Sequence, residues 1–297
     1  MLFNPSNISI DGISNDCLKK HKVSLSVVRL DKIHPVVSGN KLFKLHYFLE
    51  EAIKSGLPGI LTFGGAYSNH LVATAYSCKI AGLKSIGFVR GEKPANLSPT
   101  LLSCINYGMK LHFISREAYD KKDDKYLNLL TDTEMQYLMV PEGGYHPKGA
   151  AGAALITGFI DEATTHICTA LGTATTLAGI ITGAKKNQQV IGIPVLKGMT
   201  DIADRIAYLT GGNRPFQLLE GYHFGGYAKK TNQLISFMNQ LYQQYGLPTD
   251  FVYTSKMMFA VLDCAEKGFF APGSKITCLH TGGLQGNQSL AAGTLIF

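Results

Sequence analysis

Two kinds of segment alternate along the chain: short continuous apolar runs and longer stretches with helical periodicity. The apolar runs predict buried strands at 23–30, 59–63, 85–89, 110–114, 137–140, 166–171, 189–196, 216–220 and 275–280. Apolar residues spaced three and four apart predict helices from Leu42 to Ile53 and at 69–81, 97–107, 148–163, 176–186, 200–210, 230–245 and 255–268. This alternation predicts an α/β protein with open, twisted, mostly parallel sheets that carry helices on both faces.

A closed barrel of eight strands and eight helices is the alternative architecture for this alternation. The glycine-rich and polar loops after the strands are few and of two kinds, which favours a cleft at the switch points of open sheets. The segment PEGGYHPKGAAG at 141–152 is the best candidate for a crossing between two lobes. We therefore expect a two-lobed protein with its site in the cleft.

Composition removes several classes of function. The net charge is +7 over 297 residues, but no stretch concentrates the lysines, and the densest run, 121–125, also contains acids, so we expect no nucleic-acid partner. No run of 18 apolar residues predicts a membrane span, and no signal peptide is evident. The six cysteines form no CxxC pair and the nine histidines no HxH or HxxxH pair. We expect a cytoplasmic protein with structural thiols and no metal site.

One lysine is oddly placed. In VSGNKLFKLHYFLEEAIKSG at 37–56, Gly39 and Asn40 suit a tight turn, and Lys41 stands where the following helix begins. A cation is unfavourable there because the helix dipole makes that end positive. The same field disfavours the ammonium form and would lower the pKa of the amine. A solvated lysine at a helix end is the alternative interpretation.

A second feature is the strand, Gly/Thr loop and helix start in HICTALGTATTLAG at 166–179. Loop amides and a helix N-terminus make a ready anion site, to which Thr173, Thr175 and Thr176 add hydroxyls. An ordinary helix cap in a βα turn is the alternative. Neither a Walker loop nor GxGxxG is present, so a single phosphate is the expected anion.

A third strand end carries polar groups in LTFGGAYSNHLVATAYS at 61–77, where Ser68, Asn69 and His70 stand at the start of a helix. They are candidates for a binding shelf, although Ser68 or Asn69 could serve only as a helix cap. Hydroxyl residues follow two further strands, at Thr254 with Ser255 and at Thr281.

A lysine together with one phosphate site indicates pyridoxal 5'-phosphate, whose aldehyde forms a Schiff base with a lysine amine.

Seven segments, in order, resemble the 1-aminocyclopropane-1-carboxylate deaminase / D-cysteine desulfhydrase family: VRLDKIHPVVSGNK, GGAYSNH, PEGGYHPKGAAG, LGTATTLAG, GYHFGGYAKKT, VYTSK and HTGG. This family belongs to the tryptophan-synthase β-like, fold type II pyridoxal phosphate enzymes. The resemblance implies a cofactor in the cleft, a small amino-acid substrate and a homodimer. It also implies a large cofactor-binding domain at 1–45 and 146–297 and a small domain at 46–145.

The resemblance assigns a role to each matched position. Lys41 would be the Schiff-base lysine that also removes the Cα proton, and Lys44 would lie near the phosphate. Asn69 would bind the cofactor ring hydroxyl, and Thr254 would face the pyridine nitrogen. The remaining assignments are phosphate binding by Gly172, Thr173, Ala174, Thr175 and Thr176, substrate binding by Ser68, Asn69, His70 and Thr281, and catalysis by Lys41, Ser68, Tyr227 and Tyr253.

Three positions depart from the family pattern: Phe43 stands where arginine is usual, and Ala174 and Ala228 stand where glycine is usual. His70, Thr254 and Thr281 follow the desulfhydrase-like pattern. A threonine cannot hold a proton on the ring nitrogen as a carboxylate does, which suits β-elimination of a good leaving group. We therefore expect α,β-elimination of a small amino acid such as D-cysteine. Opening of the cyclopropane ring and cofactor binding without turnover are the alternatives.

Overall fold

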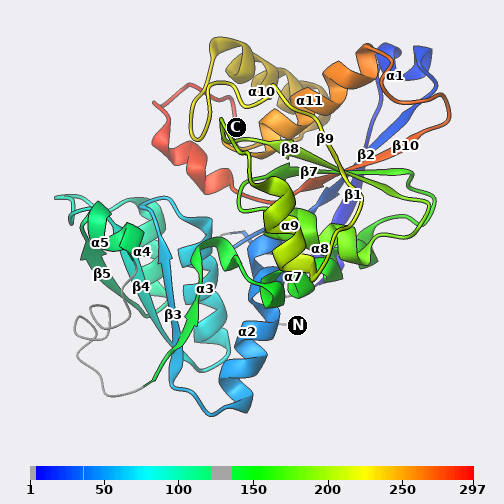
Figure 1. Cartoon of the computed structure of the whole chain (residues 1–297). Helices are drawn as coiled ribbons and strands as arrows, with labels where there is room; N and C mark the ends of the chain where they lie inside the picture. Colours follow the sequence, from blue (N-terminus) through cyan, green and yellow to red (C-terminus); the bar gives the residue numbers. More distant parts are fainter. Residues whose placement is uncertain (1–4, 36, 122–135) are drawn as a thin grey trace.

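A computed structural model describes residues 5–35, 37–121 and 136–297, and the strands of this part form two sheets (Figure 1). The six-stranded sheet has the order β1-β2-β10-β7-β8-β9, with β1 at Ser9–Ile13, β2 at Ser24–Arg29, β7 at His166–Leu171, β8 at Gln189–Pro194, β9 at Gln217–Leu218 and β10 at Lys275–His280. The four-stranded sheet has the order β5-β4-β3-β6, with β3 at Gly59–Gly64, β4 at Lys84–Arg90, β5 at Met109–Ile114 and β6 at Leu138–Val140.

Every described strand pair is parallel except that of β1 with β2. The strands predicted from apolar runs are confirmed, and the closed barrel is wrong, because the strands form two separate open sheets. The sequence analysis missed β1. Its residues SIDGI are mostly exposed or half-buried, since β1 is an edge strand and needs no continuous apolar run.

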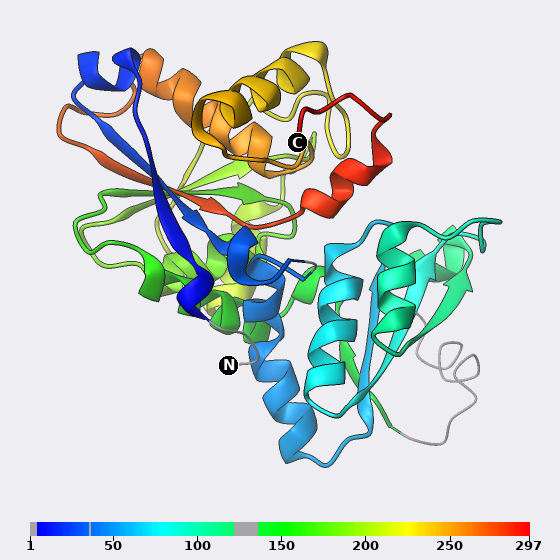
Figure 2. The same cartoon turned by 180° about the vertical axis from the view of Figure 1, so that it is seen from behind.

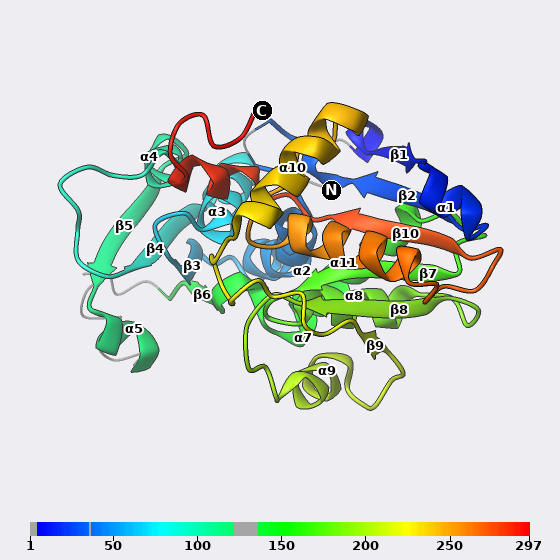
Figure 3. The same cartoon turned by 90° about the horizontal axis from the view of Figure 1, so that it is seen from above.

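The helices lie in layers on both faces of the larger sheet, with α10 and α11 on one face and α7, α8 and α9 on the other (Figure 1). Seen from above, α10 and α11 lie in front of the sheet (Figure 3). In the smaller lobe, α3 and α4 pack together. The described helices are α1 at Asp16–Lys20, α2 at Asn40–Lys54, α3 at Asn69–Ile80, α4 at Pro99–Asn106, α5 at Arg116–Lys121, α7 at Pro147–Ala154, α8 at Thr175–Gly183, α9 at Ile202–Thr210, α10 at Asn232–Tyr245 and α11 at Thr254–Glu266. Short 3-10 helices occur at Pro5–Asn7 (η1), Leu30–Ile33 (η2), Glu142–Gly144 (η3), Leu155–Phe159 (η4) and Leu284–Ser289 (η5).

Helix α2 links the two lobes. Seen from behind, it begins beside the larger sheet and runs down next to α3 of the smaller lobe (Figure 2). The predicted domain boundary at 45/46 falls inside this continuous helix, and the division into 1–45 with 146–297 and 46–145 stays a prediction. The lysine-containing run 121–125 lies outside the described residues beyond Lys121. Within the described ranges, none of the helices has the length and apolar character that a membrane crossing requires.

Phe43 has a structural reason to replace a polar residue. Its side chain is fully buried and makes an edge-to-face contact with Phe159, with ring centroids 5.9 Å apart. Helix α7 also approaches α2 closely here, because a Cβ added at Gly152 would lie 2.1 Å from the Phe43 carbonyl oxygen. This departure from the family pattern therefore belongs to the packing of α2 against η4, where α7 also approaches.

Candidate active site

The start of α2 connects Lys41 to the loop before α8. Lys41 Nζ donates to Asn40 Oδ1 at 2.9 Å, and Asn40 Nδ2 donates to Thr176 Oγ1 at 2.6 Å. Gly39, the N-cap of α2, has φ of 85°, and the Asn40 backbone N–H donates to the Thr281 carbonyl at 3.3 Å. The fold thus brings together Lys41 and two predicted site residues that are distant in sequence.

Burial controls the charge of both lysines in this part of the site. It lowers the pKa of Lys41 to about 8, and the negative charge of Asp250 acts against the shift. Lys41 is half-buried as a whole residue, but protein surrounds its amine closely enough to desolvate it. The pKa of Lys44 is well below its usual value because of burial and the charge of Lys41. Desolvation, rather than the helix-start field expected from the sequence, is therefore the main cause.

The loop at 172–176 has the form of an anion cradle. It leads into the N-terminus of α8, and the Thr173 and Thr175 hydroxyl oxygens lie 3.0 Å apart. Lys44 reaches the facing segment, where its Nζ donates to the Gly143 carbonyl at 3.1 Å. Among the described residues, no carboxylate forms an ion pair with Lys41 or Lys44. Two neighbouring buried amines beside free helix N–H groups fit an anionic ligand such as a phosphate.

Ala174 occupies this loop in a left-handed conformation, with φ of 66°. That conformation costs a non-glycine residue about 1–2 kcal/mol, and glycine loses about 0.5–1 kcal/mol through its freer unfolded chain. We expect Ala174→Gly to raise the free energy of unfolding by about 0.5–1 kcal/mol in urea titrations. The control is Ala151→Gly in α7, where ordinary helical geometry predicts a loss of about 1 kcal/mol. A loss at both positions would contradict the assigned strain.

Ser68, Asn69 and His70 lie at the start of α3, as predicted. Ser68 is the N-cap, and its hydroxyl oxygen accepts the Leu71 backbone N–H at 3.2 Å. Asn69 Oδ1 is buried and has no hydrogen-bond partner among the described residues. The side-chain amide nitrogen of Asn69 faces Gly283, since a Cβ added there would lie 3.1 Å from it. An unpartnered amide oxygen leaves Asn69 able to bind a donor.

The hydrogen bonds of His70 define its tautomer. Thr62 Oγ1 lies 2.7 Å from the Val140 carbonyl oxygen, which can only accept, so the hydroxyl proton points there. His70 Nε2, 2.8 Å from the same hydroxyl, must then donate to it. Nδ1 therefore carries a lone pair, and burial lowers the pKa of His70 to about 3. In this form the imidazole has no donor for a carboxylate, contrary to the contact expected for His70.

Thr254 begins α11, and its hydroxyl is engaged by a residue that the sequence analysis missed. Asp250 is 1% exposed, and its Oδ1 accepts the Thr254 hydroxyl at 2.7 Å. The same carboxylate accepts the backbone N–H groups of Val252, Tyr253 and Thr254 at 2.8–2.9 Å. Asp250 thus accepts the backbone N–H groups that lead into α11, and its charge lies one hydrogen bond behind Thr254. A short Asp–x–x–x–Thr spacing before a helix was the available signal.

Tyr227 and Tyr253 lie together, with ring centroids 6.3 Å apart at 68°. Burial raises the pKa of both phenols, and the negative charges of Asp250 and Glu142 act in the same direction. Tyr227 is 60% exposed, although enough protein surrounds its hydroxyl group to raise the pKa. Both phenols therefore keep their protons near neutral pH. Glu142, on the segment between the lobes, is a second nearby acid that the sequence analysis missed.

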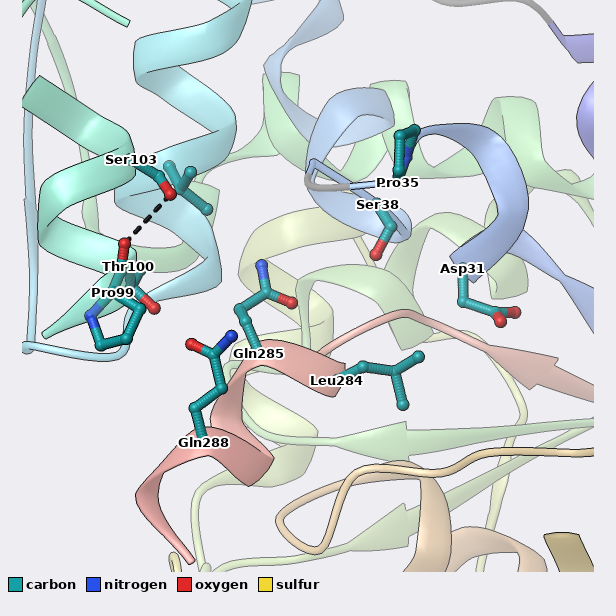
Figure 4. A pocket seen from close by; sticks show the side chains of 10 residues that line it. Asp31, Pro35, Ser38, Pro99, Thr100, Ser103, Leu284, Gln285 and Gln288 are labelled. Atoms are coloured by element: carbon teal, nitrogen blue, oxygen red, sulfur yellow. Dashed lines mark hydrogen bonds between the residues drawn. The ribbon is translucent and has the colours of Figure 1, made fainter. Parts of the chain in front are cut away.

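A cavity of about 330 Å³ lies between the lobes, bordered by α3 and α4 on one side and by η5 and the loop before α2 on the other (Figure 4). It contains none of the predicted site residues, but three of its lining residues are within three positions of one: Ser38, Val72 and Leu284. The other lining residues are Asp31, Pro35, Pro99, Thr100, Ser103, Gln285 and Gln288. The cavity is therefore a neighbour of the site rather than the site itself.

Comparison with known proteins identifies the family. The family model described as "Pyridoxal-phosphate dependent enzyme" matches residues 13–282. The chain belongs to this family. It is 29% identical over 290 residues to a protein of Thermotoga maritima provisionally named 1-aminocyclopropane-1-carboxylate deaminase, covering 90% of this chain and 91% of that protein. It is 26% identical over 288 residues to the D-cysteine desulfhydrase of Yersinia pestis (strain Pestoides F), covering 86% of each.

Solved structures agree with this membership in the pyridoxal-phosphate dependent enzymes. The crystal structure of an ACC deaminase homologue matches with a TM-score of 0.80 and 26% identity, covering 95% of this chain and 91% of that one. An O-ureido-L-serine synthase matches with a TM-score of 0.67 and 13% identity, covering 96% and 92%, which supports the fold alone. The chain is therefore a pyridoxal-phosphate-dependent enzyme of the 1-aminocyclopropane-1-carboxylate deaminase and D-cysteine desulfhydrase group.

Proposed function

We propose that Lys41 binds pyridoxal phosphate covalently and that the loop at 172–176 holds its phosphate. The observation that carries this proposal is the hydrogen-bonded connection from the Lys41 amine through Asn40 to Thr176. Lys44 would bind the phosphate through its amine, whose ammonium form the negative charge of the phosphate would favour. Asn69, whose Oδ1 lacks a partner among the described residues, would contact the cofactor ring. When bound, the cofactor supplies an electron sink conjugated to the substrate Cα.

The lowered pKa of Lys41 predicts a pH dependence. Only the neutral amine attacks an aldehyde, and a pKa near 8 makes the neutral form about 300-fold more abundant at pH 7 than it is for an ordinary lysine. We expect the rate of cofactor attachment to the apoprotein to rise about tenfold from pH 6 to pH 7 and to level off above about pH 8. Stopped-flow absorbance measures this rate. A rise that continues to pH 10 would contradict the burial of the amine.

The groups around Lys41 have separate tasks in this proposal. Lys41 takes the Cα proton of the substrate, since its amine is partly neutral near physiological pH. Ser68 and the first N–H groups of α3 hold the substrate carboxylate. Thr281 borders the same space through its position at the end of β10. Tyr253 or Tyr227, both protonated, gives a proton to the departing group.

We propose α,β-elimination of D-cysteine as the reaction. The Cα–H and Cβ–S bonds break, and one water is consumed, so that cysteine and water give pyruvate, ammonia and hydrogen sulfide. Thr254 supports this choice, because a hydroxyl rather than a carboxylate occupies the position expected to face the ring nitrogen. A weaker electron sink suits a substrate whose thiolate leaves readily. The 26% identity to a D-cysteine desulfhydrase is consistent with this substrate.

A substrate panel tests the proposed reaction. Purified protein with pyridoxal phosphate is incubated with D-cysteine, L-cysteine, β-chloro-D-alanine, D-serine and 1-aminocyclopropane-1-carboxylate. Sulfide and pyruvate are expected from D-cysteine at a higher rate than from L-cysteine. Formation of 2-oxobutyrate from the cyclopropane substrate, without sulfide release from D-cysteine, would instead establish ring opening. Light scattering of the same sample tests the proposed homodimer.

Cofactor binding without turnover is the second candidate. The left-handed conformations of Ala174 and Ala228, at positions where the family usually has glycine, favour it. Strain at the phosphate loop and at the Tyr227 loop would weaken the geometry of catalysis more than the attachment of the cofactor. A visible absorbance band that borohydride abolishes, with no product from any substrate of the panel, would establish this alternative.

A further inference from the structure

Lys256 is a buried lysine with no part in the chemistry proposed above. It lies on α11 with an exposed fraction of 0%, three residues after Tyr253. Its Nζ donates to the backbone carbonyls of His223 and Gly226 at 2.8 and 2.7 Å. Burial lowers the pKa of Lys256 to about 8, with the charge of Asp250 acting against the shift. One side chain of α11 thus holds two points of the segment that precedes Tyr227.

The segment 223–228 is strained, and its other contacts with α11 are ring contacts, of Phe224 with Phe259 and of Tyr227 with Tyr253. Phe224 and Ala228 are left-handed, with φ of 50° and 52°, and the glycines at 225 and 226 have φ of 91° and 115°. Left-handed conformations cost each non-glycine residue about 1–2 kcal/mol. The backbone bonds of the segment are local turns, from the Gly226 N–H to the His223 carbonyl and from the Lys229 N–H to the Gly226 carbonyl. A contact from outside the segment is needed to select this conformation.

The energetics of Lys256 indicate a positional role. Its hydrogen-bond partners are carbonyl groups rather than a carboxylate, so its ammonium is buried without a direct ion pair. Burying an ammonium costs several kcal/mol, and an apolar side chain of similar length would fill the same space without that cost. A lysine here adds little to stability, but its two directed bonds join the carbonyls of His223 and Gly226 to α11.

Tyr227 immediately follows the tethered Gly226, and its ring meets Tyr253 of the same α11. We propose that Lys256 is a positioning residue that holds the 223–228 segment so that the Tyr227 hydroxyl lies beside Tyr253 at the substrate site. This inference rests on the proposed function, since it gives Tyr227 a task at the substrate. It assigns Lys256 no contact with substrate or cofactor.

The absence of tryptophan from the chain allows a direct test of position. Phe224→Trp introduces a single tryptophan at a half-buried position of the segment, where the native ring meets Phe259 of α11 with centroids 5.0 Å apart. Its quenching by acrylamide in the apoprotein therefore reports whether the segment stays against α11. We expect Lys256→Met to raise the quenching constant at least about twofold, because the released segment samples more open conformations.

Two further variants serve as controls. Lys256→Arg keeps hydrogen-bond donors and should restore most of the protection of the tryptophan from acrylamide. Lys229→Met, on an exposed lysine of the same loop, is the matched control and should leave quenching unchanged. Equal quenching in the Lys256 and Lys256→Met proteins would overturn the proposal.

Kinetics give a second, independent readout. We expect Lys256→Met to lower kcat by about 10- to 100-fold with little change in KM or in cofactor content, because a displacement near 1 Å at a reacting group can cost that much. In a Tyr227→Phe background the same substitution should have little further effect, since Lys256 acts through the Tyr227 hydroxyl. Additive losses in the double variant would overturn the proposal. If Lys256→Met does not fold, Lys256→Gln, whose polar end is too short for both carbonyls, takes its place.

The two experiments separate this inference from the proposed function. If no substrate of the panel reacts, the proposed reaction fails, whereas the quenching comparison in the apoprotein still decides the role of Lys256. If the enzyme is active and quenching does not respond to Lys256→Met, the positional role fails and the proposed function stands.

Discussion

Lys41→Ala is expected to abolish covalent attachment of the cofactor and to lower kcat/KM for D-cysteine by at least about 10⁴-fold. The substitution removes the amine that bonds the aldehyde and, in the proposed reaction, the base that takes the Cα proton. The check is visible absorbance before and after borohydride, followed by mass mapping of the modified lysine.

The neighbouring lysines provide the controls for this prediction. Lys54→Ala, at the exposed end of the same helix, should retain attachment and activity, because its partner Glu50 is also on the surface. Lys44→Ala should weaken cofactor affinity while the modified lysine remains Lys41, since Lys44 contributes charge rather than a covalent bond. Recovery of the borohydride-stable label on Lys44 in the unaltered protein would reject the assignment of Lys41.

Gly39→Ala is expected to have the second largest effect, although Gly39 has no side chain to contact a ligand. A Cβ at this position would lie 1.9 Å from the Thr281 carbonyl oxygen, and φ of 85° is unfavourable for alanine. Strain and overlap together predict a loss of about 3–4 kcal/mol in the free energy of unfolding. The start of α2 must also move, and Lys41 moves with it. We expect the affinity for pyridoxal phosphate to fall at least about 100-fold.

Gly56→Ala separates the two causes, because it follows the other end of α2. Gly56 also has a positive φ, of 62°, but a Cβ there would meet nothing within 4 Å. It should lose only about 0.5–1 kcal/mol, because the conformational cost of about 1–2 kcal/mol is partly offset by the lower entropy of alanine in the unfolded chain, and it should keep its affinity for the cofactor. Urea unfolding and fluorescence titration with pyridoxal phosphate measure both quantities. Similar losses at the two glycines would show that backbone conformation, and not the approach of Thr281, makes Gly39 necessary.

The covered strands were predictable because parallel strands between two layers of helices are apolar on both faces, so each reads as a continuous run. Strand β1 was not, since an edge strand with one exposed face needs no such run. The loop at 172–176 and the lysine at 41 could be singled out by local chemistry, because glycines, hydroxyls and a helix start attract an anion wherever they occur. Their shared function came from the resemblance and from the order of the segments.

Other features depend on residues that meet only in the folded chain. The sequence predicted that Thr254 replaces a carboxylate near the ring nitrogen, but only the structure shows Asp250 hydrogen-bonded behind it. His70 reads as a polar residue at a helix start, and its neutral tautomer follows from Thr62 and Val140, on two other strands. The pKa of Lys41 was expected to be low because of the helix dipole, whereas burial is its largest cause.

By itself, the sequence determined the α/β architecture, the positions of most strands and helices, and the residues that a pyridoxal phosphate enzyme of this group would use. Those properties depend on periodicity and on short local motifs, which the order of residues specifies directly. The tertiary structure alone decided which of these residues are in contact and which amines are desolvated. It also decided to which acceptor each hydroxyl and imidazole donates its proton. Hydrogen bonding and desolvation depend on distances between groups that are brought together by the packing of helices and strands, and only the tertiary structure sets those distances.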